Sequence, residues 1–335
     1  MAGVPIGLAP LGPMRLGVVV IGRNEGERLR VCLRSVLACP RVVYVDSGST
    51  DGSVAVAEEL GVAVHRLDMS RPFTAARARN AGFEQLLATD ADIGVVQFVD
   101  GDCEVVAGWL RTALAFLVAR PDVAVVCGRR RERFPERSIY NRLCDIEWNT
   151  PVGETRACGG DAAIRASALR ETGGFRADLI AGEEPELCLR LRAKDWKIWR
   201  LDAEMTRHDA AILTFRQWWQ RTSRAGYAYA QGAHLHGRPP ERHWVRESRS
   251  AWVWGAVVPA LIVGLSLLSS PMALFGLVVY PIQFLRLYAK ANPKSPARGA
   301  SALFLVIGKF SEARGQMMFW SRQLRGGDFR LIEYK

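Results

Sequence analysis

The sequence lacks the cysteine spacing that structural zinc sites and disulfide scaffolds require. Its seven cysteines are scattered over 335 residues without a CxxC pair. An odd number of cysteines without framework spacing favours reduced thiols in the cytoplasm over disulfides or bound zinc. The first residues, MAGVPIGLAPLGPMRLG, also lack a basic region followed by a continuous apolar core. We therefore predict no signal peptide.

Two glycine motifs that cradle phosphates are absent as well. No G-x-G-x-x-G follows the first apolar run, and no G-x-x-x-x-G-K-[ST] occurs in the chain. Their absence argues against a dinucleotide-binding fold and a P-loop. A nucleotide would then have to be held in another way, and a divalent cation between carboxylates and a diphosphate is the natural alternative.

Charge is missing from a 36-residue stretch, 250–285, which contains no Asp, Glu, Lys, Arg or His. One helix of that length would be about 54 Å long, which exceeds a hydrocarbon core of about 30 Å. Ser269, Ser270 and Pro271 divide the stretch into halves that would each be about 27 Å long as a helix. We predict a membrane-spanning helical hairpin, and a pair of buried helices in a soluble domain is the alternative.

Positive charge is concentrated around this stretch. Residues 236–335 contain 14 Lys and Arg against 5 Asp and Glu, whereas residues 1–235 contain 31 against 29. Basic residues on both sides of a hairpin predict that both of its ends are cytoplasmic. The apolar segment 301–310 is too short to span a membrane, and its basic surroundings predict an amphipathic helix on anionic lipid.

Four parts of the chain follow from these patterns. We predict an α/β domain at 1–235, a basic linker at 236–249, a transmembrane hairpin at 250–287, and an interfacial amphipathic helix with a cytoplasmic tail at 288–335.

The first part alternates short apolar runs with segments of helical periodicity. Strands are predicted at 17–22, 41–46, 61–67 and 93–100, and helical patterns lie between them. This order predicts a Rossmann-like, doubly wound and mostly parallel sheet. Ligands of such sheets bind at the carboxyl ends of the strands.

Polar residues follow three of these strands. Asn24 and Glu25 come after the first, Asp46 after the second, and Asp100 and Asp102 after the fourth. No Lys or Arg adjoins the Asp-Gly-Asp segment. An ordinary turn would explain Asp and Gly there. Acids at three strand ends of one sheet edge instead favour a site for a cation or for sugar hydroxyls.

Five motifs in this order, the last of them made of two segments, resemble the nucleotide-sugar-dependent glycosyltransferases of family 2, which have the GT-A fold. They are VVVIGRNEGERLRVCLRSVL, VVYVDSGSTDGS, AARARNAGF, VDGDCEV, and the pair CGGDAAIRASALRETGGF and GEEPELCLRLRAKDWKIWRL. The resemblance covers most of residues 16–232. It implies a membrane-anchored, bacterial-type member of the family.

The resemblance also implies roles for single residues on the donor side. Asp46 would lie near the base or ribose of the nucleotide, in a pocket shaped by Asn24 and Glu25. Arg79 would assist the nucleotide side, and Asp100 would contact the ribose or the metal. The implied metal ligands are Asp102 and His208, and the implied ion is Mn²⁺ or Mg²⁺.

On the acceptor side, the resemblance places Glu184 at the position of the catalytic base. The family usually has Asp there, and Pro185 follows in this chain, so Glu183 is an alternative base. Both glutamates would also suit the first turn of a helix, where negative charge is favourable. Ser47 replaces a second Asp of the base-binding segment, which weakens any assignment of the nucleobase. Asp161 stands where the family more often has Asn and receives no role.

Two further segments are basic or aromatic. The arginine-rich segment 128–137 is predicted to be a solvated loop, with contact to lipid head groups or an acceptor diphosphate as the alternative. The segment 216–232 contributes candidate contacts to an acceptor or lipid: Trp218, Trp219, Arg221 and Arg224. Processive polysaccharide synthases have Gln-x-x-Arg-Trp near this position, whereas this chain has Gln-Trp-Trp-Gln-Arg, which favours transfer of one sugar per encounter.

Together with these observations, the resemblance implies an inverting, metal-dependent transferase of the hexosyltransferase type. It would move one sugar from a nucleotide-diphosphate sugar, with a UDP-sugar favoured, to a lipid-linked saccharide at the cytoplasmic face of the inner (plasma) membrane, in polysaccharide biosynthesis. A polyprenyl-phosphate glycosyltransferase is the enzymatic alternative, and a non-catalytic nucleotide-sugar-binding membrane scaffold is the alternative of another class. Membrane lipids would be partners and nucleic acid would not, since the basic excess adjoins apolar spans and no recognition module is visible.

Overall fold

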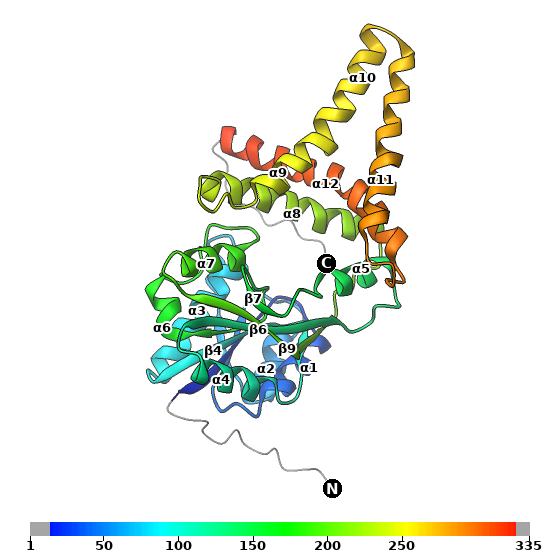
Figure 1. The fold of residues 1–335 in the computed structure, drawn as a ribbon. Coiled ribbons are helices and arrows are strands. Elements are labelled where there is room, and N and C mark those ends of the chain that lie inside the picture. The colour runs from blue at the N-terminus through cyan, green and yellow to red at the C-terminus, as the bar shows by residue number, and fades with distance from the viewer. Residues whose placement is uncertain (1–13, 326–335) are drawn as a thin grey trace. The chain divides into compact units, whose positions relative to one another are not determined.

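The computed structural model describes residues 14–325, which divide into two compact units (Figure 1). The sheet unit comprises residues 14–134, 145–179 and 183–210. The helical unit comprises residues 135–144, 180–182 and 211–325. The short segment 180–182 thus packs with the helices, although the sheet unit precedes and follows it in the chain.

The four predicted strands are present and lie side by side in the order β3-β2-β1-β4, all parallel. The intervening helices are also present. The elements of this half are β1 (Arg15–Gly22), α1 (Glu27–Val36), β2 (Val42–Asp46), α2 (Ser53–Glu59), β3 (Ala63–Arg66), α3 (Ala75–Thr89) and β4 (Ile93–Asp100). In the register of this half Gly22 pairs with Asp46, and Ile21 pairs with Asp100. The predicted polar strand ends therefore meet at one edge of the sheet.

Beyond β4 the sheet is mixed, continuing in the order β8-β6-β9-β5, with β7 paired to β9. The elements of this half are β5 (Cys103–Val105), α4 (Trp109–Ala119), β6 (Val123–Glu132), β7 (Gly153–Thr155), β8 (Ala162–Arg165), α6 (Ala166–Glu171), α7 (Glu183–Arg192) and β9 (Lys197–His208). Only β6 and β9 are parallel neighbours here, and the other pairings are antiparallel. The mostly parallel arrangement thus holds for the first half of the sheet.

Apolar side chains of the strands form the core of the sheet unit. Val18, Val19 and Val20 of β1 have no exposed surface, and neither do Leu29 and Leu33 on the inner face of α1. Burial of each such side chain contributes about 1.5–3 kcal/mol to folding. This core fixes the strands whose ends bear the polar residues.

The helical unit is built on two long helices, α8 (Phe215–His236) and α12 (Arg298–Arg325). Thr214 caps the first of them in a capping box with Gln217. The predicted ten-residue helix at 301–310 is in fact part of the 28-residue α12. One face of α12 packs on α8, so α12 is held by protein along much of its length. Contact of its other face with lipid stays a prediction.

An apolar hairpin extends from these helices, and its two arms, 245–268 and 271–290, run side by side (Figure 1). Its elements are α9 (Val245–Trp252), η1 (Val253–Val257), α10 (Val258–Leu268), η2 (Pro271–Val278) and α11 (Val279–Lys290). Two continuous helical stretches, Val245–Leu268 and Pro271–Lys290, are long and apolar enough to cross a membrane, and at most 6% of their apolar windows is buried. The chain breaks at Ser269 and Ser270, as predicted. Residues of α5 (Ile139–Glu147) are divided between the two units.

Candidate active site

Asp46 and Asn24 hold the loop that follows β2. The buried carboxylate of Asp46 accepts hydrogen bonds from Tyr44 Oη at 3.0 Å and from the backbone nitrogens of Gly48 and Ser49, each at 3.0 Å. Asn24, in the left-handed backbone region with φ 56°, accepts from the backbone nitrogen of Thr50 at 2.7 Å. Both side chains thus shape the loop after β2, and a role of this loop in nucleotide binding stays a prediction.

Glu25 lies beside this loop, at the end of β1. Its carboxylate forms an ion pair with Arg28 at 2.8 Å. Its side chain also adjoins Gly101, where an added Cβ would lie 3.1 Å from the carbonyl oxygen of Ile21 and 3.2 Å from Cγ of Glu25. Gly101 therefore fits tightly against β1, a close approach that the sequence does not reveal.

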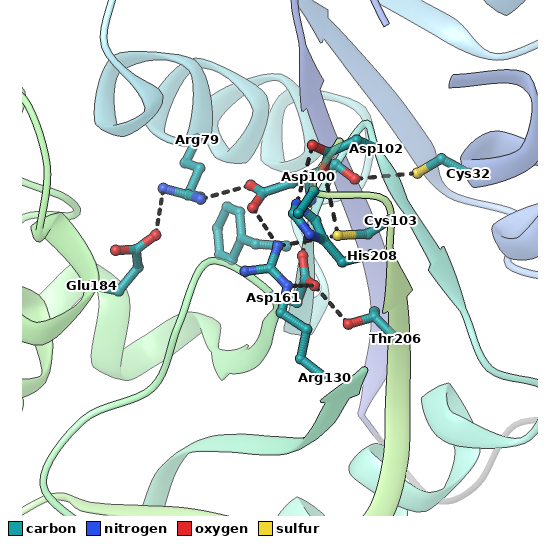
Figure 2. A network of polar contacts seen from close by, with 12 residues as sticks. Cys32, Arg79, Asp100, Asp102, Cys103, Arg130, Asp161, Glu184, Thr206 and His208 are labelled. Carbon is teal, nitrogen blue, oxygen red and sulfur yellow. Dashed lines mark hydrogen bonds and ion pairs between the residues drawn. The ribbon is translucent and has the colours of Figure 1, made fainter. Parts of the chain in front are cut away.

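Asp100 meets two guanidinium groups, which lie far from it in sequence. Arg79 of α3 contacts one carboxylate oxygen at 2.9 Å, and Arg130 of β6 contacts the other at 2.8 Å (Figure 2). Burial alone would raise the pKa of Asp100, but the two guanidinium groups outweigh it and hold that pKa well below its usual range. Asp100 is therefore compensated, contrary to the impression given by its neighbours in sequence.

Arg130 and Asp161 complete this network, and neither was assigned a role from the sequence. Arg130 Nε lies 3.1 Å from Asp161 Oδ2, which also accepts a hydrogen bond from Thr206 Oγ1 at 2.7 Å. The other oxygen of Asp161 accepts from the backbone nitrogen of Asp100 at 3.0 Å. Arg130 also stacks over Trp148, at 5.2 Å from the ring centroid. The predicted solvated loop at 128–137 was wrong as far as Glu132, because β6 continues to that residue.

Asp102 and His208, the two predicted metal ligands, lie together. His208 Nε2 is 3.1 Å from Asp102 Oδ2, and β5 brings them together because Cys103 pairs with His208 on β9. Burial, and then Arg130, lower the pKa of His208 despite the opposing effect of Glu132. The imidazole is therefore neutral near pH 7, as a metal ligand must be.

The surroundings of this pair also suit a divalent cation. His208 Nδ1 is buried and lies 3.8 Å from Glu132 Oε2, so a carboxylate lies behind the imidazole, just beyond hydrogen-bond distance of it. Cys103 Sγ lies in the same group of donor atoms, all within 4.8 Å of one another. Burial raises the pKa of the Cys103 thiol well above its usual range. A protonated thiol is a poor ligand, so Asp102 and His208 are the better candidates.

Glu183 and Glu184 begin α7 and share the guanidinium of Arg79. Arg79 Nη1 lies 2.7 Å from Glu183 Oε1 and 3.0 Å from Glu184 Oε1, while its other terminal nitrogen holds Asp100. Burial and the neighbouring charge of Glu183 raise the pKa of Glu184 to about 7. Such a pKa suits a general base near neutral pH. Both glutamates also occupy the first turn of α7, so the helix-dipole interpretation applies together with the ion pairs.

The four candidate contacts on α8 lie in the helical unit, and two of them have internal roles. Trp218 is only 6% exposed and packs against Phe304, at a centroid distance of 4.8 Å, and against Tyr140. Trp219 is half-buried and adjoins Phe215. Arg224 donates to the carbonyl oxygen of Ile180 at 2.9 Å. A buried Trp218 offers little surface to an acceptor, whereas contacts by Trp219 and Arg221 stay predictions.

Comparisons with known proteins find similarity to glycosyltransferases. The family model described as Glycosyl transferase family 2 matches residues 17–171. Glycosyltransferase AglE of Haloferax volcanii is 25% identical over 181 residues, which are 50% of this chain and 58% of the relative. Pre-mycofactocin glycosyltransferase of Mycobacterium tuberculosis is 30% identical over 200 residues, which are 54% of this chain and 40% of the relative. The chain thus spans about half the length of the curated relatives it matches.

A solved structure extends the likeness over most of the chain. Mannosyltransferase PcManGT from Pyrobaculum calidifontis, in complex with GDP-Man and Mn²⁺, is 20% identical with a TM-score of 0.61, and the match covers 90% of this chain and 87% of that one. At this identity the likeness concerns the fold. Residues 17–171 are thus similar to glycosyl transferase family 2, and the sheet unit of the chain has the GT-A fold.

Proposed function

We propose that the chain is an inverting, metal-dependent glycosyltransferase that moves one sugar from a nucleotide-diphosphate sugar to a lipid-linked saccharide at the cytoplasmic face of the plasma membrane. The observation that carries the proposal is the double contact of Arg79. One guanidinium holds Asp100 on the donor side and Glu183 and Glu184 on the acceptor side. A donor and a base of suitable pKa would therefore meet within one network of ion pairs.

The donor would bind at the strand ends of β1, β2 and β4. Asp102 and His208 would hold a Mn²⁺ or Mg²⁺ ion, which supplies positive charge against the charge growing on the departing diphosphate. The complex of PcManGT with GDP-Man and Mn²⁺ supports a nucleotide sugar and a metal as the ligand class. The sequence favours a UDP-sugar and this relative suggests a GDP-sugar, so both belong in any test.

Glu184 would accept the proton of the attacking hydroxyl. Its pKa of about 7 leaves a substantial fraction of the carboxylate unprotonated near neutral pH. The attack would come from the face opposite the leaving diphosphate, which inverts the configuration at the anomeric carbon. Arg79 would keep the carboxylate in place, since its Nη1 lies 3.0 Å from Glu184 Oε1.

A lipid-linked acceptor is supported by the apolar hairpin. Two helices of membrane-crossing length follow the sheet unit, and basic residues flank them on both sides. Basic flanks on both ends favour a cytoplasmic location of both ends. An acceptor attached to lipid would then be confined to the surface on which the enzyme itself resides.

The decisive experiment compares wild-type protein with Glu184→Gln, using radiolabelled UDP- and GDP-sugars, Mn²⁺ and membrane lipid extract. We expect the variant to bind the donor normally and to lose about 10²-fold or more in transfer, the usual scale for acid–base help. A matched Glu171→Gln variant, which removes an exposed carboxylate on α6, should transfer normally. Unchanged transfer by Glu184→Gln would remove this residue from the mechanism.

The same assay separates the alternatives. A polyprenyl phosphate is already ionised and needs no base, so full transfer to that acceptor by a Glu183→Gln, Glu184→Gln double variant would favour the polyprenyl-phosphate glycosyltransferase. Donor binding without any transfer or donor hydrolysis would favour the non-catalytic scaffold. Binding of nucleoside diphosphate that is no tighter with Mn²⁺ or Mg²⁺, and unaffected by Asp102→Ala, would contradict the metal site.

A further inference from the structure

The turn that precedes the two glutamates is anchored among the helices. Ile180 is 2% exposed and packs with Tyr227 and Phe319. Its carbonyl oxygen accepts the hydrogen bond from Arg224 Nη2 of α8 at 2.9 Å. The chain then passes through Gly182 directly into Glu183, the first residue of α7. The position of the glutamates therefore depends on how firmly residues 180–182 are held.

The indole of Trp244 packs directly on this turn. A Cβ atom added to Gly182 would overlap Cη2 of Trp244 and lie 2.7 Å from its Cζ3. On α8, a Cβ added to Gly232 would overlap Cε3 of the same ring. Two glycines thus allow one indole to lie against both the turn and the helix. Gly182 also has φ +82°, a left-handed conformation that favours glycine.

Other contacts hold the indole in this position. His243 stacks on it with ring centroids 4.3 Å apart, and Tyr229 meets it edge-on at 5.4 Å. The backbone of Trp244 lies in the left-handed region with φ +52°. That conformation costs a non-glycine residue of order 1–3 kcal/mol, and it persists only where surrounding contacts determine it. The packing of the ring is therefore strong enough to keep a strained backbone.

Trp244 also immediately precedes the first candidate membrane span. It is the N-cap residue of α9, and the continuous helical stretch Val245–Leu268 begins at the next residue. One residue thus connects the apolar hairpin with the turn before Glu183 and Glu184.

We infer that Trp244 is a positioning residue for Glu184, holding the turn at Gly182 so that α7 begins where Arg79 can pair with both glutamates. The inference rests on the proposed function in so far as Glu184 is the base. Without the indole, the turn and the first turn of α7 would open more often, because the first amides of a helix have no intrahelical partner to restrain them. Misplacement of a reacting group by about 1 Å can cost about 10²-fold in rate.

The test uses the full chain in detergent and compares Trp244→Ala, Trp244→Phe and a control, Trp196→Ala. Trp196 lies just beyond the far end of α7 and donates to Glu171, so its loss removes a similar aromatic surface away from the turn. Hydrogen exchange of the peptide spanning 178–190 is measured for each, together with kcat, KM for the donor, and calorimetric binding of nucleoside diphosphate with Mn²⁺.

For Trp244→Ala we expect faster exchange in this peptide, kcat lower by about 10-fold to 10²-fold, and donor binding within about 2-fold of wild type. In Trp244→Phe both the exchange rate and kcat should lie closer to the wild-type values. In Trp196→Ala neither quantity should change. Normal exchange in Trp244→Ala, or faster exchange with normal kcat, would overturn the positioning role. If Trp244→Ala does not fold, Gly232→Ala displaces the same indole from α8 without changing the turn itself, and it should show the same pattern.

Failure of the inference is distinguishable from failure of the proposed function. Wild-type protein that transfers no sugar would refute the function, and with it the role of Glu184 as base, whereas the exchange measurement would still decide whether Trp244 holds the turn. Wild-type transfer combined with normal behaviour of Trp244→Ala would refute only the inference.

Discussion

Asp100 and Glu184 differ in pKa because they contact different numbers of guanidinium groups. Asp100 contacts two guanidinium groups, whereas Glu183 and Glu184 share one with it. Burial therefore dominates at Glu184 and raises its pKa to about 7, while the pKa of Asp100 is held well below its usual range. Asp100 therefore stays ionised near neutral pH, whereas Glu184 can gain or lose a proton there.

At the residue scale we predict the effect of Glu183→Gln on the pH dependence of transfer. The groups that act on Glu184 are Glu183 of its own helix, Arg79 of α3 and Asp100 of β4. A base must be unprotonated, so kcat should rise as pH increases through the pKa of Glu184. Removing the negative charge of Glu183 lowers that pKa, and the rise should move to lower pH.

The measurement is a pH–rate profile of kcat between about pH 5 and pH 9, within the range over which side chains of this kind titrate. Glu171→Gln, which removes a distant carboxylate, should leave the midpoint unchanged. A midpoint that stays in place or moves to higher pH in Glu183→Gln would show that Glu183 does not tune Glu184.

Residue-level chemistry could be predicted from the sequence only where a local pattern marked it. Asp100, Asp102 and Asp46 follow apolar strands, and parallel strands necessarily bring their ends together. Arg130 and Asp161 were not predicted because both contact Asp100, which is 30 residues from Arg130 and 61 residues from Asp161 in sequence. These contacts depend on the order of strands β4, β8 and β6 in the sheet. A buried acid after two glycines, in CGGDAA, was the available signal for Asp161.

At the scale of elements, the presence of a strand or helix was easier to predict than its length. The strands β1 to β4 were visible as short apolar runs. By contrast, β6 continues through Arg129, Arg130 and Arg131 because β9 pairs with it there, and no pattern in one strand reveals the length of its neighbour. The same holds for α12, whose central turns pack on α8 through small and polar residues such as Ser311 and Gly315, so no apolar run marks this part of the helix.

The crossing of α8 and α12 gives a prediction at this scale. A Cβ added to Gly315 would overlap the carbonyl oxygen of Ser223 and lie 2.7 Å from the backbone nitrogen of Tyr227, whereas the nearest atom to one added at Gly308 is 3.5 Å away. Gly315→Ala should therefore force the helices apart and lower stability by about 1–3 kcal/mol, the usual cost of overpacking.

Gly308→Ala is the matched control on the same helix. The added Cβ at residue 308 would lie at ordinary van der Waals distances from its neighbours. Replacing glycine by alanine within a helix favours folding by about 0.5–1 kcal/mol. Thermal unfolding in detergent should thus move in opposite directions for the two variants. Equal shifts would mean that α12 does not approach α8 as closely as the structure describes.

The whole molecule combines a GT-A unit of nearly balanced charge with a basic helical region. The last hundred residues carry most of the excess of +11, and their apolar helices expose side chains such as Leu261 and Ile282 at 60% and 56%. Two adjacent helices with this much exposed apolar surface are unusual outside a membrane. The exposed apolar helices and the basic residues around them are different sets of residues, and both support a membrane location for the hairpin.

The last prediction concerns the topology of that hairpin. If Val245–Leu268 and Pro271–Lys290 each cross the membrane, the break at Ser269 and Ser270 lies on the far side, and both flanks lie in the cytoplasm. Alkaline phosphatase, which needs an oxidising compartment to form its disulfides, should be active when inserted between Ser269 and Ser270 and inactive when inserted after Pro293.

The control tests whether insertion depends on the apolar helices themselves. An arginine near the middle of a span costs about 2.5–3.5 kcal/mol on insertion scales, so Leu261→Arg combined with Ile282→Arg should abolish phosphatase activity at Ser269. A hairpin that only dips into the membrane would leave the phosphatase inactive at both positions while the protein still sediments with membranes. The sheet unit would then be tethered without spanning, and a lipid-linked acceptor would remain accessible to it from the same side.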